Sequence, residues 1–359
     1  MVLGKNGVLH IGLIALIAYL ATSSLWWLFL YPAFLISADI LYYMFHIRIF
    51  DPEERIVRGY EFASIYIDSP FGEGLDLGFN LYEGDYSKSR SQAQMDKWDF
   101  LIEKLNLKKG MRLIDIGCGF GDWMNYAKSK GIEVVGVNIS DAQAKIARQR
   151  GLDVICSNWK DVLDDLDQNE NLAGKFDAVT FMDTVEHYVP AQYRVNREEQ
   201  NKIYTQMFEF AHQLLNDQSS SKRVFISCLH SRVEVNQSIK SNIVNYFLDK
   251  FHSGCYPVYE IDQLVMNGTG SQFEFIERWN KTLDYFKTSV INPEHFGIQK
   301  MKWNLKRFVY VFYFMLVDPD SIHKWIYRWN QNWMRQFDSD KIEESPMQLL
   351  WLLFQKADS

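Results

Sequence analysis

Residues 113–123 read LIDIGCGFGDW, an apolar run that ends in an aspartate and three closely spaced glycines. Glycines at this spacing let the backbone turn sharply and approach a ligand closely, where a Cβ atom would intrude. Such a turn is typical of the connection from a strand to a helix in an open α/β sheet, whose ligands bind beyond the carboxyl ends of the strands. The stretch therefore predicts an α/β fold with a ligand pocket beside the turn.

Short apolar runs alternate with amphipathic stretches on both sides of this turn. The pattern predicts strands at 112–117, 132–140, 153–158, 176–183 and 223–229, and helices at 91–107, 122–130, 141–150 and 203–215. Strands and helices that alternate at such short intervals form a parallel sheet covered by helices on both faces. In the first helix the apolar residues fall near one face. These residues are Trp98, Leu101, Leu105 and Leu107.

The chemistry around the glycines indicates the kind of ligand. Dinucleotide folds use the spacing G-x-G-x-x-G, which brings a helix amino terminus to a pyrophosphate. Here the spacing is G-x-G-x-G, and Asp115 stands two positions before Gly117. A carboxylate repels phosphate but suits a cation with an amino group, such as S-adenosylmethionine with its sulfonium and α-ammonium groups. The alternative is a plain glycine-rich turn with no ligand.

Charge and cysteine content exclude two classes of partner. The formal net charge of −7 argues against a nucleic-acid partner, because nucleic-acid affinity depends on a basic surface. The four cysteines are scattered and lack the paired spacing of a zinc site, so no metal is expected. They are predicted to be reduced thiols in a protein that faces the cytosol. They are Cys118, Cys156, Cys228 and Cys255.

The amino-terminal stretch 7–45 contains a single charged residue, Asp39. As a helix it would extend roughly 60 Å, about twice the hydrocarbon thickness of a bilayer. A signal peptide, a buried core helix and a membrane hairpin are the three interpretations. The polar break at 21–24, with apolar sequence on both sides, favours the hairpin. Basic residues beyond both ends of the stretch predict a membrane protein whose catalytic domain faces the cytosol.

Several motifs resemble the cyclopropane fatty acid synthase family, which includes mycolic acid cyclopropane synthases and fungal sphingolipid C9-methyltransferases. LNLKKGMRLIDIGCGFGDW resembles the family pattern L-x-L-K-P-G-x-x-x-L-D-I-G-C-G-W-G, and EVVGVNISDAQ resembles x-V-x-G-V-T-x-S-x-x-Q. FDAVTFMDTVEH resembles F-D-x-I-x-S-x-x-x-F-E-H. Later, LDYFKT resembles D-Y-x-x-T and QLLWLLF resembles Q-L-W-Q-x-V-F. The resemblance is close over 92–158 and continues in patches to residue 354.

This resemblance implies a class I methyltransferase (Rossmann-like) open α/β sheet with a helical cap, preceded here by the membrane segment. It implies an S-adenosylmethionine-dependent methyltransferase that modifies a membrane lipid at a C=C bond of an acyl or sphingoid chain. The expected organisation is a membrane anchor at 1–50, a linker and pocket-entry region at 51–90, a cofactor-binding core at 91–235, and a helical lipid-binding cap with carboxyl-terminal strands at 236–359.

The resemblance also assigns the cofactor-binding residues. They are Tyr86, Ser87, Asp115, Gly117, Gly119, Gly121, Asn138, Ser140, Gln143, Asn158, Trp159 and Asp183. For Gln143 the alternative is a solvated position in the first turn of a helix. For Trp159 the alternative is a place in the hydrophobic core.

Glu186 and His187 match the E-H pair of the family, and Tyr327 is the third catalytic candidate. In the family, the glutamate belongs to a site that holds bicarbonate, the base that removes a proton after methyl transfer to an alkene. An alkene is a weak nucleophile, and its methylation leaves a carbocation that needs a nearby base and a water-free surround. The alternative for Glu186 is an acid at a helix start, stabilised by the helix dipole.

Three other positions of the bicarbonate site differ from the family. No cysteine precedes Cys118, although the family has Y-S-C-A-Y upstream; the family histidine after the fifth strand aligns with Ser227, and His230 lies three residues later. The late family tyrosine aligns near Trp329, with Tyr327 close by. Bicarbonate binding and cyclopropane formation are therefore in doubt, and a methyl branch or methylene is the expected product. N-methylation of an amine headgroup or small amine, and a degenerate non-catalytic membrane-tethered binding subunit, remain alternatives.

Overall fold

The computed structural model describes residues 56–57, 60, 78–166, 171–232, 256–259, 261–291 and 347–358. The predicted anchor at 1–50 and the catalytic candidate Tyr327 lie outside these ranges, as does most of the predicted cap. Among the helices that the structure describes, none has the length and apolar character needed to cross a membrane.

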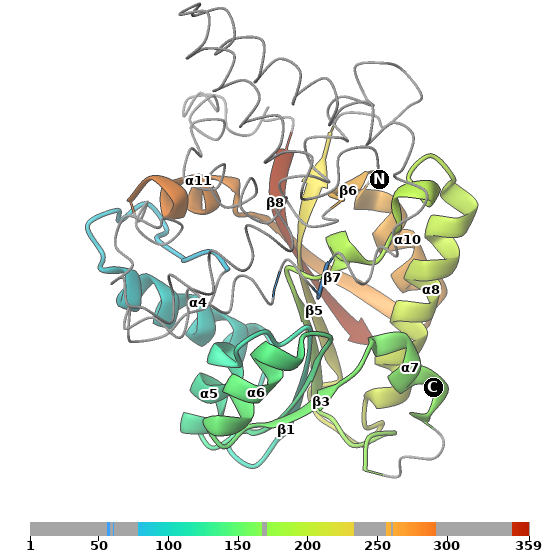
Figure 1. The fold of residues 1–359 in the computed structure, drawn as a ribbon, viewed down its shortest axis with the longest axis horizontal. Helices are drawn as coiled ribbons and strands as arrows, with labels where there is room; N and C mark the ends of the chain where they lie inside the picture. Colours follow the sequence, from blue (N-terminus) through green and yellow to red (C-terminus); the bar gives the residue numbers. More distant parts are fainter. Residues whose placement is uncertain are drawn as a thin grey trace, which may run out of the picture.

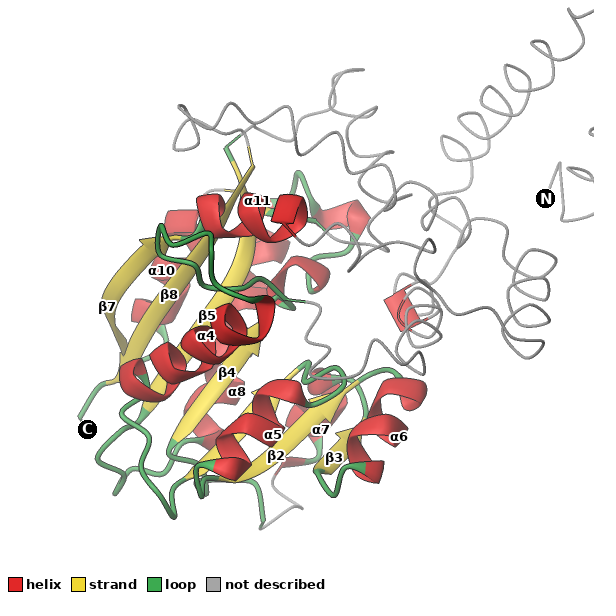
Figure 2. Ribbon diagram, turned by 90° about the vertical axis from the view of Figure 1, so that its left-hand side faces the viewer, coloured by secondary structure: helices red, strands yellow, loops and turns green. Residues whose placement is uncertain are grey.

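The described core is one twisted sheet (Figures 1 and 2). Its strands lie in the order β3-β2-β1-β4-β5-β8-β7, and the short β6 pairs with β5 beyond this path. Their bounds are β1 Arg112–Ile116, β2 Glu133–Asn138, β3 Asp153–Cys156, β4 Ala178–Met182, β5 Arg223–Ser231, β6 Val258–Tyr259, β7 Phe273–Asn280 and β8 Met347–Lys356.

Strands β1 to β5 are parallel, as predicted. No direction was predicted for the carboxyl-terminal strands, and β8 runs antiparallel between β5 and β7. Strand direction does not follow from an apolar run such as QLLWLLF, since the same run suits either pairing. The observed sheet is therefore mixed.

Helices cover both faces of the sheet (Figure 1). One face carries α4 Arg90–Lys104, α5 Asp122–Ser129 and α6 Asp141–Gln149. The other carries α7 Trp159–Asp164, α8 Arg197–Leu214 and α10 Ile261–Gly270. A further helix, α11 Thr282–Ile291, lies near the start of α4 (Figure 2). This two-sided cover confirms the predicted layering.

The apolar pattern of the first predicted helix is confirmed by its packing. Trp98 and Leu101 are buried in a cluster that also contains Phe225 and Trp351 from the sheet. The helix ends at Lys104, three residues earlier than predicted, and Asn106 has a left-handed φ of 50°. A left-handed residue cannot continue a right-handed helix, so the chain turns there toward β1.

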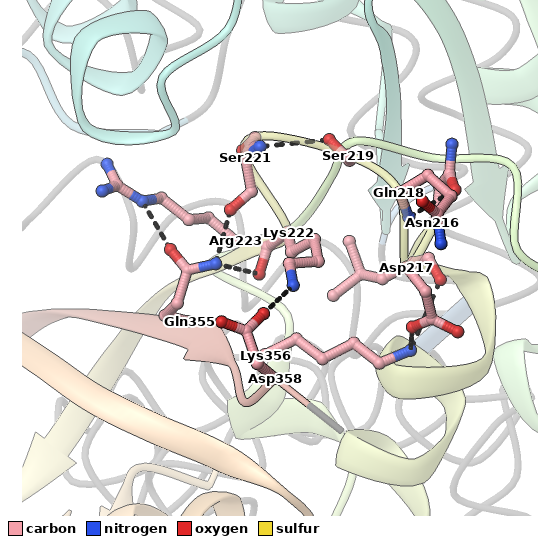
Figure 3. Close-up of polar contacts among 11 residues, drawn as sticks. Asn216, Asp217, Gln218, Ser219, Ser221, Lys222, Arg223, Gln355, Lys356 and Asp358 are labelled. Carbon is pink, nitrogen blue, oxygen red and sulfur yellow. Dashed lines mark hydrogen bonds and ion pairs between the residues drawn. The ribbon is translucent and has the colours of Figure 1, made fainter.

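At the amino-terminal end of β5, polar side chains fix the last residues of β8 (Figure 3). Lys356 is buried, and its Nζ atom donates to the carbonyl oxygen of His212 at 2.9 Å and pairs with Asp217 at 2.6 Å. Arg223 donates to the side-chain oxygen of Gln355 at 3.0 Å. The carboxyl end of the parallel strands, at the opposite side of the sheet, is left for the ligand site.

Candidate cofactor and catalytic site

The glycine turn follows β1, and its three glycines have different surroundings. A Cβ atom on Gly117 would lie 2.2 Å from Thr184 Cγ2, and one on Gly121 would lie 2.4 Å from Leu152 Cδ1, so packing excludes side chains at both positions. Gly119 has φ +55°, and among the described residues no atom beyond its chain neighbours lies within 4 Å of where its Cβ would be. The turn therefore leaves open space above Gly119, as expected where a ligand meets the backbone.

Asp115 is buried at the end of β1. Its Oδ1 atom accepts a hydrogen bond from the Thr180 hydroxyl at 2.7 Å, and the Trp123 indole donates to the same hydroxyl at 3.3 Å. The neighbouring strand and the helix after the turn thus fix this carboxylate in place. It supplies a negative charge two residues from the glycine turn.

The end of β2 is tied to the glycine turn by a buried amide. The Nδ2 atom of Asn138 donates to Gln143 Oε1 at 3.0 Å and approaches the Gly119 carbonyl oxygen at 3.4 Å. Ser140 caps α6 and accepts from the Gln143 backbone N–H. Gln143 is only 3% exposed, so the alternative of a solvated position is wrong. The structure brings these predicted residues together beside Gly119.

Asn158 and Trp159 begin α7 after β3. The Asn158 side chain caps the helix by accepting from the Lys160 N–H at 3.1 Å. Trp159 is buried in the core, with its ring 5.0 Å from that of Tyr188 and 6.0 Å from that of Phe210. Core packing accounts for the tryptophan, and its predicted contact with adenine stays a prediction.

Asp183 follows β4 in a left-handed conformation with φ 55°. Its N–H donates to the Ser227 carbonyl oxygen at 2.8 Å, and the Ser227 hydroxyl donates to its Oδ1 atom. Ser227 is buried on β5. β5 therefore holds the Asp183 carboxylate at the carboxyl end of the strands. Ser227, which makes both hydrogen bonds, stands at the position that aligns with the family histidine.

Glu186 lies in the short 3-10 turn Val185–His187 and is 3% exposed. Burial raises its pKa well above the ordinary value, and the charge of Asp183 raises it further. Hydrogen bonds from its own backbone and from that of Leu229 oppose this shift. Among the described residues, its Oε2 atom has no hydrogen-bond partner. Burial and the charge of Asp183 thus both favour the protonated form of this side chain.

Other buried groups around Glu186 favour their protonated forms as well. Burial raises the pKa of Tyr204 on α8, and Cys228 and Glu186 add to the effect. Burial also raises the pKa of the Cys228 thiol, and Glu186 and Asp183 add to it. Both residues belong to the hydrophobic core, and such surroundings disfavour additional negative charge near Glu186.

His187 is linked to the region before the core. Its Nε2 atom lies 2.8 Å from the Tyr60 hydroxyl, and the two rings meet edge to face at 5.6 Å. His230, at the end of β5, instead has its Nδ1 atom 2.8 Å from the Val258 carbonyl oxygen. His187 directly follows Glu186 in the chain, and His230 directly follows Leu229, whose backbone bonds to the Glu186 carboxyl.

The predicted pair Tyr86 and Ser87 stands before α4. The Lys287 ammonium of α11 lies 4.6 Å from the centre of the Tyr86 ring. Ser87 is exposed, and its hydroxyl donates to Asp85 at 2.6 Å. These contacts face α11 and the local turn, so a role for either residue in cofactor binding stays a prediction.

The D-Y-x-x-T motif on α11 acts by holding the segment before Tyr86. Asp284 Oδ1 accepts from the backbone N–H groups of Tyr82 at 2.8 Å and Glu83 at 3.1 Å. Thr288, one turn later, accepts from the N–H of Asn80 at 3.0 Å. Burial raises the pKa of Asp284, and these backbone donors oppose the shift.

Asn80 is a candidate site residue that the sequence did not reveal. It is 1% exposed, yet neither its Oδ1 nor its Nδ2 atom has a hydrogen-bond partner among the residues that the structure describes. The preceding residue, Phe79, packs against Leu229, whose backbone bonds to the Glu186 carboxyl. The unpaired amide therefore lies near the carboxyl edge of β5. Only its burial indicates a role, because a lone asparagine in a loop carries no sequence signal.

Comparison with known proteins places these features in a family. The family model described as mycolic acid cyclopropane synthetase matches residues 81–306, more than half of the chain. The chain belongs to this family. The resemblance seen in the sequence motifs is thereby confirmed.

Among relatives, the chain is 39% identical over 106 residues to a cyclopropane-fatty-acyl-phospholipid synthase of Escherichia coli, covering 28% of this chain and 25% of that protein. It is 29% identical over 106 residues to a sphingolipid C9-methyltransferase of Candida albicans, covering 27% of this chain and 20% of the relative. The matched part is thus about a quarter of the length of these relatives or less.

Solved structures confirm the class I methyltransferase fold. The mycolic acid cyclopropane synthase CmaA1, complexed with SAH and CTAB, has a TM-score of 0.59 at 16% identity, over 86% of this chain and 100% of that one. The cyclopropane synthase MmaA2 from Mycobacterium tuberculosis has a TM-score of 0.58 at 15% identity, over 85% and 99% of the two chains. At these identities the likeness concerns the fold alone.

Proposed function

We propose that this protein is an S-adenosylmethionine-dependent methyltransferase that acts on a C=C bond in the acyl or sphingoid chain of a membrane lipid. The observation that carries the proposal is the open space above Gly119. It follows the fixed carboxylate of Asp115, at the carboxyl ends of the strands, where the buried acid Glu186 also lies. Family membership supports both the cofactor and the type of reaction.

The residues present suit the cofactor. The backbone at Gly119 offers a cradle that any side chain would fill, and Asp115 supplies a negative charge for a cationic amino acid group. The buried, unpaired amide of Asn80 can both donate to a carboxylate and accept from an ammonium group. When bound, the cofactor supplies an electrophilic methyl group on a sulfonium.

The surroundings of Glu186 suit reaction at an alkene. A methylated alkene is a carbocation, which water would capture if it reached the pocket. Glu186, Tyr204 and Cys228 are all buried, and burial raises the pKa of each. The chain thus offers a dry site with acid groups next to it, which an amine substrate does not require.

Two observations support a lipid as the substrate. The names of the relatives include a fatty-acyl-phospholipid synthase and a sphingolipid methyltransferase. The apolar stretch 7–45 suits a membrane anchor, which would place the catalytic domain at the cytosolic face of a membrane that contains the lipid.

Methyl transfer to vesicles tests the proposal. Full-length protein is incubated with labelled S-adenosylmethionine and vesicles of either dioleoyl phosphatidylcholine or an unsaturated glucosylceramide, and the lipids are fragmented by mass spectrometry. We expect one added CH2 on the hydrocarbon chain. Addition to the headgroup of an amine lipid would replace the proposal with N-methylation. Failure to bind S-adenosylhomocysteine in calorimetry would indicate a non-catalytic subunit.

A further inference from the structure

The described residues do not fit the bicarbonate that the family resemblance implies. Ser227 stands at the position that aligns with the family histidine, and its hydroxyl is already donated to Asp183. Two acidic side chains, Asp183 and Glu186, lie close enough for the charge of one to act on the other. A bound anion would be repelled by any negative charge on this pair. Among the described residues, the carboxylate of Asp183 is a proton acceptor that the chain itself supplies at this place.

The backbone at Asp183 shows that its side chain is held in a special position. A φ of 55° is uncommon for a residue other than glycine, although aspartate tolerates it better than most. Such strain persists where the surrounding structure fixes it, and it is concentrated at functional sites. Here the Ser227 carbonyl oxygen and hydroxyl fix the N–H and the carboxylate of Asp183, respectively.

Glu186 differs from Asp183 in its environment. Its side chain is 3% exposed and leaves Oε2 without a hydrogen-bond partner, whereas Asp183 is partly exposed and hydrogen-bonded through Oδ1. An ionised carboxylate is stable where donors and water reach it, and a neutral acid is stable where they do not. When two carboxyl groups interact and share one proton, the group with fewer donors and less water around it holds the proton for more of the time.

We propose that Asp183 and Glu186 form a carboxyl pair that holds one proton in the resting enzyme and replaces bicarbonate, with Asp183 as the proton acceptor and Glu186 as its neutral partner. This inference rests on the proposed function. The π electrons of the alkene form the new bond to the methyl carbon, and S-adenosylhomocysteine leaves. A C–H bond beside the resulting cation then breaks, and its electron pair forms a C=C bond. The proton goes to the Asp183 carboxylate, which is exposed enough to release it to water.

Infrared difference spectroscopy on full-length protein tests the division of the proton without any substrate. At neutral pH we expect a protonated-carboxyl band in the wild type that disappears in Glu186→Gln and persists in Asp183→Asn. Because burial also raises the pKa of Asp284, the spectrum of the variant Asp284→Asn shows how much of the protonated-carboxyl band comes from that residue. A band that disappears in Asp183→Asn and persists in Glu186→Gln would overturn the assignment, and so would no band from either residue.

Kinetics test the role of Asp183 as acceptor. Asn is isosteric and also tolerates the left-handed backbone, so Asp183→Asn should fold. Because Asp183 is also a predicted cofactor-binding residue, kcat is measured at saturating S-adenosylmethionine, where we expect a fall of about a hundredfold or more. The wild-type rate should change by less than about twofold between bicarbonate-depleted and bicarbonate-supplemented buffer, because bicarbonate is not the base in this proposal. Loss of the true base would typically lower the rate by about a hundredfold. A wild-type kcat in Asp183→Asn, or a rate that depends strongly on bicarbonate, would refute the proposal.

The two experiments separate this inference from the proposed function. If the wild type binds S-adenosylhomocysteine but methylates neither vesicle, the lipid assignment has failed. The infrared result still decides whether Glu186 holds the proton and Asp183 does not. If methylation proceeds normally in Asp183→Asn, the lipid assignment stands and the carboxyl pair has failed.

Discussion

Replacement of Gly119 by arginine separates the cofactor pocket from the stability of the fold. Within the described part of the chain, no atom beyond the adjacent residues lies within 4 Å of the Cβ position at Gly119, so the longer side chain meets none of these atoms at its base. It enters the open space above the turn, where the cofactor is proposed to bind, and its positive charge repels a sulfonium. We expect Gly119→Arg to fold and to lose measurable affinity for S-adenosylhomocysteine and S-adenosylmethionine.

The cost to stability follows from the backbone. Gly119 has φ +55°, and a non-glycine residue in the left-handed region costs about 1–2 kcal/mol. For a protein of this size such a loss lowers the melting temperature by roughly 1–3 °C. Since no steric clash is added, the variant should remain folded at 25 °C, and its circular dichroism spectrum should match that of the wild type.

Gly174→Arg is the matched control. Gly174 has φ +65° and likewise no atom within 4 Å of its Cβ position, but it lies in the turn before β4, at the opposite end of the sheet. We expect a similar fall in melting temperature with unchanged cofactor affinity in calorimetry. Equal affinity in Gly119→Arg and the wild type would refute the pocket assignment. Equal loss of affinity in both variants would show that strain, not the pocket, is responsible.

Further predictions concern the anchor, the two ends of the sheet and the buried acid. Deletion of 1–46 should abolish resistance to alkaline carbonate extraction but not cofactor binding, because apolar burial is worth about 25 cal/mol per Å². Lys356→Met should lower the free energy of unfolding by about 1–3 kcal/mol in urea titrations, because the carbonyl oxygen of His212 at the end of α8 loses its donor. Its control, Lys222→Met, removes the ion pair with the exposed Asp358 (Figure 3) and should cost less than about 1 kcal/mol. Asp284→Ala should speed amide hydrogen exchange at Tyr82, because its acceptor is lost. Glu186→Gln should melt at a higher temperature than the wild type, and the difference should grow as pH rises above 4.5. Above this pH the unfolded wild type releases the Glu186 proton while the folded state keeps it. The wild type therefore loses stability as pH rises toward the raised pKa of Glu186.

The sequence predicted the α/β core well because the signals there are local. The apolar run before Gly117 and the helical spacing around Trp98 each determine one element, and the glycine turn fixes how strand and helix connect. The direction of β8 could not be predicted in this way, because it depends on pairing with β5, over a hundred residues earlier in the chain. Pairing between such distant segments is decided by tertiary packing and leaves no local pattern.

The site was predicted in part for the same reason. Asn138 and Gln143 were found because they follow a strand at a motif spacing, and the structure joins them to the glycine turn. Asn80 was missed because its only unusual property is an unpaired amide in a buried position, which requires the fold to be known. The raised pKa of Glu186 was missed as well, since burial and the nearby Asp183 act only in three dimensions.

The positions that match the family and those that depart from it have different physical roles. Gly117 matches because a side chain there would collide with Thr184, and Asp284 matches because it accepts two backbone N–H groups. These demands come from the fold, so they persist whatever reaction follows methyl transfer. Ser227 departs from the family, and its hydroxyl binds a carboxylate. The departure at Ser227 thus touches the carboxyl pair to which we assign proton removal, whereas Asp115 and Gly117, which we assign to the cofactor, match the family pattern.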